Sequence, residues 1–305
     1  MRHSVFAVNH SIMTIDLHTL QPAEKQYYLQ HAVAPRPICF ASTVDKEGHV
    51  NLSPFSFFNL FSSHPPVVVF SPSRRVRDNT TKHTLENVLE VPEVVISIVT
   101  YEMVQQTSLS SCEFPREVDE FIKAGFTAVP ATLVKPPLVK ESPVNMECRV
   151  LEVKPLGTEG GAGNLVICEV LRMHMADELF NAEGKLEQQR FHHVARLGGD
   201  WYCKVDSTNL FRVEKPNTKL GIGVDSLPVH IRNSTILTGN NLGQLANVHE
   251  LPVIQPGFDD PHLKQIIQYY SINPSDLEKE LHLYAQKLLD QGQVQAAWQV
   301  LLATE

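Results

Sequence analysis

Residues 34–59 read A-P-R-P-I-C-F-A-S-T-V-D-K-E-G-H-V-N-L-S-P-F-S-F-F-N, and this stretch predicts β-structure. The apolar, β-branched run Ile38–Val44 is typical of a strand. Asp45–Gly48 predicts a turn, and Val50–Phe58 predicts a second strand with small and aromatic side chains. A third strand, Val67–Phe70, follows a Pro-Pro break. Three short strands in close succession therefore open the predicted domain.

Hydroxyl and cationic side chains gather directly after the third strand. They are Ser71, Ser73, Arg74, Arg75, Arg77, Lys82 and Thr84. Lys82 also precedes a predicted helix, T-L-E-N-V-L-E, with Thr81 or Thr84 near its cap. Free N–H groups and the positive end of the helix dipole favour anions at such a start. A run of charges is usually a solvated loop, but the density of hydroxyls and cations favours a phosphate site here.

The aromatic strand before this loop predicts the other end of the same pocket. Pro54 interrupts ladder hydrogen bonding, so this segment is an edge, a bulge or a place where a ligand replaces a neighbouring strand. Most of its aromatic rings are best explained as barrel or dimer packing; they are Phe55, Phe57, Phe58 and Phe61. Backbone amides and hydroxyls then remain to face a ligand that is flat at one end and phosphorylated at the other.

The rest of the chain predicts a mainly β fold, a β-barrel with inserted helices. Further strands are expected at Val94–Thr100, Val144–Pro155 and Asn164–Met175, and helices at Pro22–Gln30, Tyr101–Ser108 and Val118–Ala124. Because strands and helices do not alternate as βαβ units, an antiparallel barrel is favoured. Amphipathic helices are expected near the C-terminus at His262–Tyr270, Ser275–Gln291 and Gln293–Ala303, with Ser275 as an N-cap.

Three regions follow from this pattern. Residues 1–21 are expected to form an N-terminal extension, with Met13 as a candidate natural start. Residues 22–215 are expected to form the barrel domain, and residues 216–305 a largely helical C-terminal extension. The extension carries no set of catalytic residues, so it is interpreted as an appendage that packs on the barrel or on a partner chain.

Bulk properties exclude several functional classes. A net charge of -8 argues against general nucleic-acid binding, which depends on neutralising phosphates. The longest apolar stretches have the length of strands, so no membrane span is expected, and the first dozen residues lack the apolar core of a signal peptide. The five cysteines lack CxxC spacing, which favours buried thiols in a cytoplasmic protein over disulfides or zinc. His192 and His193 are adjacent and point apart in an extended segment, so no metal site is expected.

Two arginines leave alternatives open. Arg36 lies between two prolines, so its guanidinium is either aimed by a rigid segment or exposed at a strand entrance. Arg196 precedes a glycine pair and the aromatic residues Trp201 and Tyr202. This group either approaches a flat ligand or packs as ordinary core.

Taken together, the motifs resemble the flavin reductase-like, FMN-binding split-barrel family, and within it the flavoredoxin branch. The resemblance spans Ala34–Tyr202 and rests on P-R-P-I-x-F-A-S-T-V-D, N-L-S-P-F-S-F-F-N, P-P-V-V-V-F-S-P-S-R-R, K-H-T-L-E-N-V and V-A-R-L-G-G-x-x-Y. It implies a six-stranded split barrel and a homodimer with FMN near the interface. It also implies electron transfer from a nicotinamide nucleotide or another donor to flavin.

The resemblance also implies which residues bind the cofactor. Ser53, Pro54, Phe55, Ser56 and Asn59 match the strand that contacts the isoalloxazine and ribityl groups. The phosphate is expected near Ser71, Ser73, Arg74, Lys82 and Thr84, although His83 replaces the aspartate of the family's K-D-T motif. Arg196 matches a motif near the flavin. No catalytic side chain is assigned, because hydride transfer to flavin is the chemistry of the cofactor itself.

Three hypotheses remain. The leading one is an FMN-dependent flavin reductase that uses NADH or NADPH as a transient co-substrate. The alternative is an FMN-binding electron carrier or flavin store without NAD(P)H turnover, and consumption of the nucleotide in the presence of FMN separates the two. The third is an interaction protein without flavin, in which the helical extension does the work.

Overall fold

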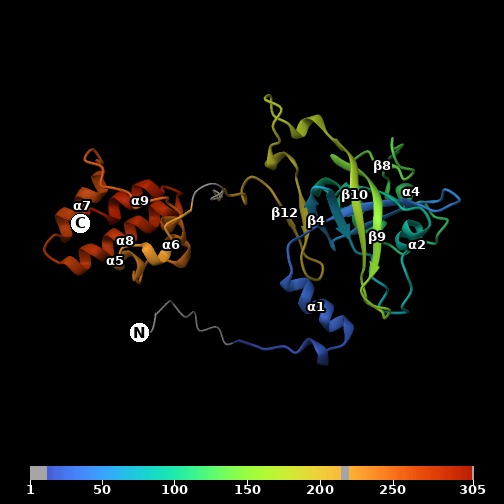
Figure 1. The fold of residues 1–305 in the computed structure, drawn as a ribbon, viewed down its shortest axis with the longest axis horizontal. Helices are drawn as coiled ribbons and strands as arrows, with labels where there is room; N and C mark the ends of the chain where they lie inside the picture. The colour runs from blue at the N-terminus through green and yellow to red at the C-terminus, as the bar shows by residue number, and fades with distance from the viewer. Residues whose placement is uncertain (1–11, 214–219, 304–305) are drawn as a thin grey trace. The chain divides into compact units, whose positions relative to one another are not determined.

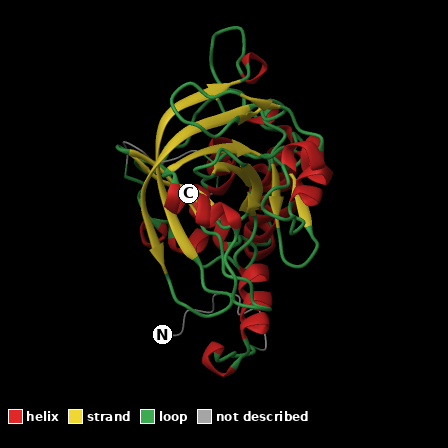
Figure 2. Ribbon diagram, turned by 90° about the vertical axis from the view of Figure 1, so that its right-hand side faces the viewer, coloured by secondary structure: helices red, strands yellow, loops and turns green. Residues whose placement is uncertain are grey.

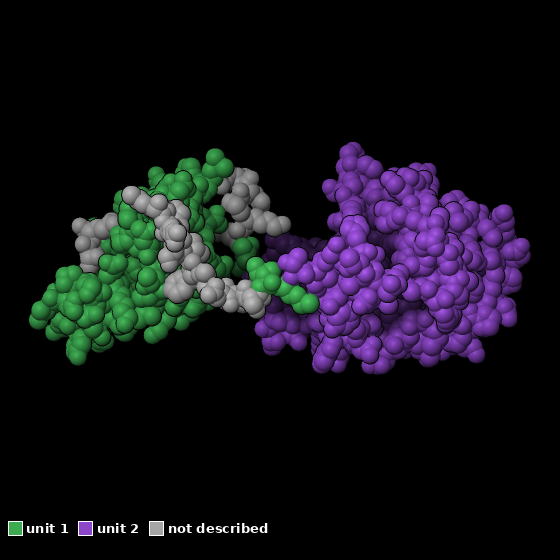
Figure 3. Space-filling view, turned by 90° about the horizontal axis from the view of Figure 1, so that it is seen from below, with its two compact units in different colours: residues 1–13, 212–305 green, residues 14–211 purple. Residues whose placement is uncertain are grey.

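The computed structural model describes residues 12–213 and 220–303. The chain divides into two compact units (Figure 3). One is Thr14–Phe211, called the barrel unit below; the other combines Arg212–Glu305 with Met1–Met13 and is called the helical unit. The expected boundary at residue 216 and most of the expected N-terminal extension lie outside the described residues.

A seven-stranded antiparallel sheet dominates the barrel unit, with strand order β3-β2-β6-β9-β10-β5-β4. Its strands are β2 (Cys39–Val44), β3 (Val50–Phe55), β4 (Phe58–Ser63), β5 (Pro66–Phe70), β6 (Glu93–Ile98), β9 (Val144–Pro155) and β10 (Asn164–Met175). Two small sheets contain β1 (Arg36–Pro37), β11 (Val194–Arg196) and β12 (Tyr202–Lys204), and β7 (Ala128–Val129) and β8 (Leu138–Val139). The β9–β10 hairpin is the longest element pair of the unit (Figure 1).

The large sheet curls until its two edges meet. β3 and β4 lie at opposite ends of the strand order, yet only Ser56 and Phe57 separate them in the chain. Near this link, the Phe55 and Phe70 ring centroids are 5.1 Å apart, and the Ser71 N–H donates to the Phe57 carbonyl at 2.8 Å. The strands therefore wrap into a split barrel, as the curved ribbons of Figure 2 show.

This closure corrects one expectation. The prediction of a single strand over Val50–Phe58 is wrong, because β3 ends at Phe55 and Phe58 begins β4 on the other edge of the sheet. Pro54 lacks the N–H that would continue the ladder on its outer side, which fits a strand about to leave its sheet. The division gives the sheet seven strands instead of the six that the resemblance implied.

Four α-helices and two apolar clusters complete the barrel unit. The helices are α1 (Pro22–Ala32), α2 (His83–Glu90), α3 (Val104–Ser110) and α4 (Glu120–Ala124). Alternate residues of β2 enter opposite clusters, as a pleated strand requires: Cys39 packs in a cluster with Leu85 of α2, and Phe40 in a cluster with Phe121 of α4. All five cysteines are free thiols: Cys39, Cys148 and Cys168 are buried as expected, whereas Cys203 is half-buried and Cys112 is exposed.

The helical unit has a core of its own. Its helices are α5 (Val229–Arg232), α6 (Gly239–Ala246), α7 (Pro261–Tyr270), α8 (Pro274–Asp290) and α9 (Val294–Leu301). Buried leucines surround Trp298, which is fully buried. Ser275 is not the N-cap of α8, because Asn273 takes that position and Pro274 the first helical one. The mainly β fold with a C-terminal helical region is thus confirmed. No helix in either described part of the chain is long and apolar enough to cross a membrane.

Candidate functional site

The predicted ring-binding residues lie on both sides of the barrel closure. Ser53, Pro54 and Phe55 end β3, Ser56 is in the link, and Asn59 belongs to β4. Phe55 is buried in the apolar cluster that α2 covers, whereas Asn59 is exposed. The closure therefore brings the two groups of residues together although they belong to opposite edges of the sheet.

Lys82 stands at the start of α2 beside this strand. Its Nζ lies 5.9 Å from the centroid of the Phe55 ring. Lys82 is the N-cap of α2, and no side chain caps that helix. Burial, and then repulsion by Arg75, lower the pKa of Lys82, while Glu113 partly offsets them. Among the described residues the Lys82 ammonium group has no hydrogen bond or ion pair, so it is a partly buried cation without a direct counter-ion.

The neighbouring arginines are engaged within their own loop. Arg74 donates from Nε to Asn79 Oδ1 and from its terminal nitrogen to the Asn79 carbonyl, both at 2.6 Å. Arg75 and Arg77 bind the two oxygens of Glu113 at 3.0 and 2.8 Å. Their guanidinium groups fold the loop and tie it to Glu113. Lys82 is the cation that remains unpaired among the four that the sequence placed in this region.

Ser71 and Ser73 lie against a glycine turn. Ser73 forms a bridge with Gly163, and a Cβ added to Gly163 would lie 2.7 Å from Ser71 Oγ. Any larger residue at Gly163 would displace Ser71. The Ser71 hydroxyl thus lies close to Gly163, and the backbone of Ser73 is joined to the same glycine.

Thr84 differs from its expected placement. Neither it nor Thr81 caps α2: Thr81 donates to Glu86, and Thr84 is buried and donates to Asn51 Oδ1 at 2.6 Å. The sequence indicated a threonine close to a phosphate, but the hydroxyl is directed into the protein. Its backbone N–H still belongs to the first turn of α2.

A buried polar chain behind Thr84 was missed from the sequence. Asn51 donates from Nδ2 to Glu120 Oε1, and the Leu52 N–H donates to Glu120 Oε2, both at 3.0 Å. Burial raises the pKa of Glu120, and these hydrogen bonds partly offset that rise. Asn51 stands next to the recognised L-S-P-F motif, but Glu120 is far away in sequence, and no local pattern marks it as a partner.

Arg36 and Arg196 form a second group, next to the closure. They pair across β1 and β11, and the Arg36 guanidinium carbon lies 5.9 Å from the Phe57 ring centroid. Arg36 is buried and donates to the carbonyls of Gln30 and Val33, both at 2.7 Å, so it closes the C-terminal end of α1. It is therefore a structural arginine and not a solvent-facing one.

Arg196 is held by its own turn. Its guanidinium donates to Gly199 O at 2.6 Å and to the Tyr202 hydroxyl, and stacks 4.5 Å from the Tyr202 ring centroid. None of these contacts joins Arg196 to Lys82. Among the predicted site residues, Phe55 thus lies beside Lys82, whereas Arg196 lies in a separate group with Tyr202.

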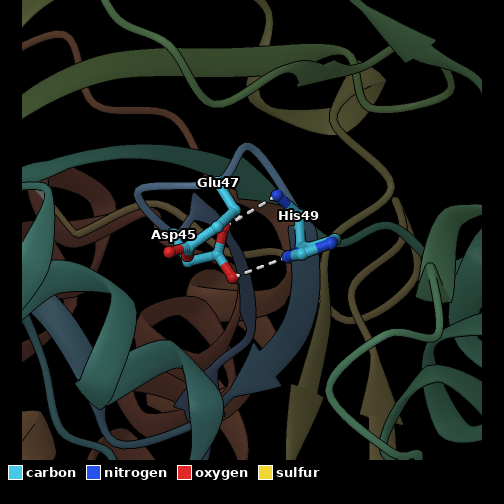
Figure 4. Close-up of side chains that lie close together, drawn as sticks. All are labelled: Asp45, Glu47 and His49. Atoms are coloured by element: carbon cyan, nitrogen blue, oxygen red, sulfur yellow. Dashed lines mark hydrogen bonds and ion pairs between the residues drawn. The ribbon is translucent and has the colours of Figure 1, made fainter.

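One set of potential metal ligands occurs among the described residues, in the turn between β2 and β3. Ligand atoms of Asp45, Glu47 and His49 lie within 4.8 Å of one another (Figure 4). Asp45 already accepts from the His49 N–H at 2.8 Å and lies near Arg116 Nε at 3.4 Å. Burial opposes the charge of Asp45, but the His49 and Arg116 hydrogen bonds lower its pKa to about 2. Asp45 and His49 are thus engaged in stabilising the turn.

Comparison with known proteins identifies the family to which this chain belongs. The family described as flavin reductase like domain matches residues 31–194, more than half of the chain, and the chain belongs to that family. An uncharacterized protein of Aquifex aeolicus is 37% identical over 172 residues, which are 56% of this chain and 85% of the relative. Membership supports a flavin-related redox function and a flavin cofactor.

Two solved structures are similar over the barrel. Component B of nitrilotriacetate monooxygenase from Bacillus cereus has a TM-score of 0.62 and 27% identity, covering 67% of this chain and 100% of that one. The 2-nitrobenzoate 2-nitroreductase of Pseudomonas fluorescens has a TM-score of 0.60 and 25% identity, covering 69% and 100%. The recognised family and its split-barrel fold are confirmed.

Proposed function

We propose that this chain is an FMN-dependent flavin reductase-like oxidoreductase that passes electrons from NADH, NADPH or another donor to flavin. The observation that carries the proposal is Lys82. Its ammonium group has no counter-ion in the described chain, and it sits at an uncapped helix start beside the strand end at Phe55. A dianionic phosphate supplies the missing charge.

The donors present fit the phosphate of FMN. The first-turn N–H groups of α2, at His83 and Thr84, have no side-chain cap and are available to an anion. Lys82 adds a charge that burial keeps poorly solvated. We assign the phosphate to these groups, with Ser71 and Ser73 beside them. The Arg74 side chain supports the loop and does not need to touch the ligand.

The ring end of the site is assigned to the barrel closure. Asn51, Ser53 and Phe55 point to one face of β3, because side chains alternate along a strand. Asn51 meets α2 at Thr84, and Phe55 lies under Lys82, so Ser53 faces the first turn of the helix between them. Backbone and hydroxyl groups of Ser53–Ser56 and Asn59 would orient the ring, and Arg196 would border it near Phe57.

FMN, when bound, supplies the electron-transfer chemistry. The chain's own contribution is to bind and orient it. Donors fixed by the fold would stabilise negative charge on the ring, since they need no reorganisation. The aromatic pair Phe55 and Phe70 excludes water from the wall of the barrel behind the site. No proton has to be taken up by a side chain in this scheme.

A homodimer is the proposed assembly. Phe57, Leu60 and Phe61, at or beside β4, are 42%, 64% and 67% exposed. Leu171 and Met173 of β10, two places along the same sheet, are 41% and 50% exposed. A second copy that covers these exposed side chains would bury them, Phe57 included, next to the ring end of the site. The buried free thiols Cys39, Cys148 and Cys168 fit the reducing cytoplasm.

The test begins with the purified full-length chain. FMN titration should give a yellow 1:1 complex per protomer, and NADH or NADPH should be consumed when FMN is added. Lys82→Ala should weaken FMN binding by about 2 kcal/mol, roughly 30-fold, as expected for a charge-assisted contact. Arg77→Ala is the matched control, because it removes a neighbouring exposed cation that is already paired with Glu113.

The outcomes separate the hypotheses. A protein with no measurable FMN affinity contradicts the proposal altogether and returns attention to an interaction protein without flavin. FMN binding without oxidation of either nucleotide favours the electron carrier or flavin store. FMN binding that Lys82→Ala and Arg77→Ala reduce equally would assign the phosphate to general loop charge instead of Lys82.

A further inference from the structure

The buried chain Thr84–Asn51–Glu120 connects the two parts of the proposed site. Thr84 belongs to the first turn of α2, Asn51 to β3, and Glu120 to the start of α4. Their exposed fractions are 1%, 8% and 4%, and the hydrogen bonds that join them are 2.6 and 3.0 Å long. Lys82 is two residues before Thr84, and Ser53 is two residues after Asn51. The chain therefore spans the gap between the proposed phosphate and ring ends.

The carboxylate sets the direction of every hydrogen bond in this chain. An ionised carboxylate only accepts, and both Glu120 oxygens do so here, from Asn51 Nδ2 and from the Leu52 N–H. Asn51 must then turn its carbonyl towards Thr84, whose hydroxyl proton is used to donate to it. The Thr84 hydroxyl has no second proton for a ligand. Its orientation, and with it the first turn of α2, is fixed from within the protein.

A second tie holds the rest of the helix independently. Asn87 Nδ2 donates to Thr43 Oγ1 of β2 at 3.1 Å, and Asn87 lies one turn after Thr84 on the same buried face. Leu85 and Val88 add apolar contacts to the same cluster as Phe55. Loss of the Glu120 end would thus free the first turn of α2 while the remainder of the helix stays packed.

We propose that Glu120 and Asn51 are positioning residues of the flavin site, which hold β3 and the first turn of α2 at the separation that FMN requires. This inference rests on the proposed function. Neither residue needs to touch the ligand: Glu120 is two hydrogen bonds away from the helix that offers its N–H groups. The pair acts by fixing the place of Lys82 and of the free N–H groups of His83 and Thr84 relative to Ser53.

The test compares Glu120→Ala with Glu120→Gln in the full-length chain, with FMN as the probe. Alanine removes the anchor and should raise the FMN dissociation constant about tenfold. Glutamine can accept from the Leu52 N–H and donate to a turned Asn51 amide, which then donates to Thr84. It should restore FMN affinity to within about threefold of wild type.

Ser97→Ala is the matched control for stability. Ser97 Oγ donates to Asn145 Oδ1 at 2.6 Å, a buried hydroxyl–asparagine bond of the same length between β6 and β9. It should lower the melting temperature and leave FMN affinity unchanged. If Glu120→Ala fails to fold, Asn51→Ala carries the same test, because it breaks the chain one bond closer to Thr84.

The result can overturn the inference without touching the proposed function. If wild type binds FMN and Glu120→Ala binds it equally well, the inference is wrong and the proposed function stands. If Glu120→Gln loses as much affinity as Glu120→Ala, the carboxylate acts by charge and the positioning role is also wrong. A wild-type protein that binds no FMN overturns the proposed function itself.

Discussion

The barrel unit and the helical unit are stabilised in different ways. The helical unit buries a continuous set of leucines and Trp298, and Asn241, His282 and Gln299 are its few buried polar side chains. The barrel unit also has an apolar interior, but buried Asn, Thr, Ser and Glu side chains join its loops and helices to the sheet. The helical unit is specified by helix periodicity, whereas the barrel unit depends on individual hydrogen bonds that place its loops.

This difference between the units indicates where we expect the functional residues. Buried polar groups that are joined by hydrogen bonds fix the geometry around them, since each must keep its partner. The barrel has such groups around its closure and around α2, where the family match and the unpaired Lys82 also lie. We therefore expect flavin binding to respond to single polar substitutions around the start of α2 and not to core substitutions in the helical unit.

The largest expected effect is on the stability of the helical unit. Trp298→Ala should destabilise that unit by about 3–5 kcal/mol, because it empties the centre of its core. Denaturant unfolding followed by circular dichroism measures the loss, and FMN titration of the same variant should match wild type. Tyr269→Ala is the control, since Tyr269 is 80% exposed. A loss of FMN affinity in Trp298→Ala would contradict the expectation that flavin binding does not depend on the core of the helical unit.

Glu147 gives the next effect, in the barrel. This fully buried carboxylate accepts from Thr132 N–H and hydroxyl at 3.0 and 2.7 Å and contacts His174 Nε2 at 2.7 Å. Burial alone would raise the pKa of Glu147, but these hydrogen bonds lower it to about 2. Its contribution, about 3 kcal/mol, is present above its ordinary pKa of 4.5 and lost as the pH falls towards 2.

Urea unfolding at pH 7 and at pH 3 measures this dependence. Glu147→Gln should be less stable than wild type at pH 7 and approach it as the pH falls, because the wild type then loses the same contribution. Arg149→Gln, which removes one side of a surface ion pair with Glu169, should change stability by less than about 1 kcal/mol at either pH. A constant difference between Glu147→Gln and wild type at both pH values would contradict the assignment.

A smaller effect is expected at Gly198, where α1 meets the R-L-G-G turn. A Cβ at this position would overlap ring atoms of His31, the residue that follows Gln30 in α1. Gly198→Ala should cost about 1–2 kcal/mol, since the His31 ring must move away. The second substitution His31→Ala should recover most of that loss, which a double-mutant cycle by thermal unfolding measures. If the stability losses of the two single variants simply add up in the double variant, the contact between residue 198 and His31 does not cause the loss.

Sequence reasoning found the fold from its strands and motifs. The β9–β10 hairpin and the helices near the C-terminus follow directly from alternation and amphipathic spacing. The closure at Ser56 was missed, because nothing local says that a strand will change edges of the sheet. At the closure Phe55 packs against Phe70, and the Phe57 carbonyl accepts from the Ser71 N–H; both partners are distant along the chain.

For the candidate site, the sequence showed which residue types gather there but not how their side chains pair. The sequence put four cations beside a helix start, but pairing with Asn79 and Glu113 leaves only Lys82 unpaired among them. Thr84 was expected to face a phosphate, yet its hydroxyl turns inward to Asn51. Hydrogen-bond partners across dozens of residues decide these roles, and composition or periodicity does not record them.

The most direct test of the Lys82 assignment uses two ligands that differ only in the phosphate. FMN and riboflavin are titrated against wild type and Lys82→Ala, and the four dissociation constants form a cycle. The substitution should weaken FMN binding by roughly 30-fold and leave riboflavin binding within about twofold. Equal weakening of both ligands would contradict the assignment, since Lys82 would then act on the ring or on the fold instead of on the phosphate.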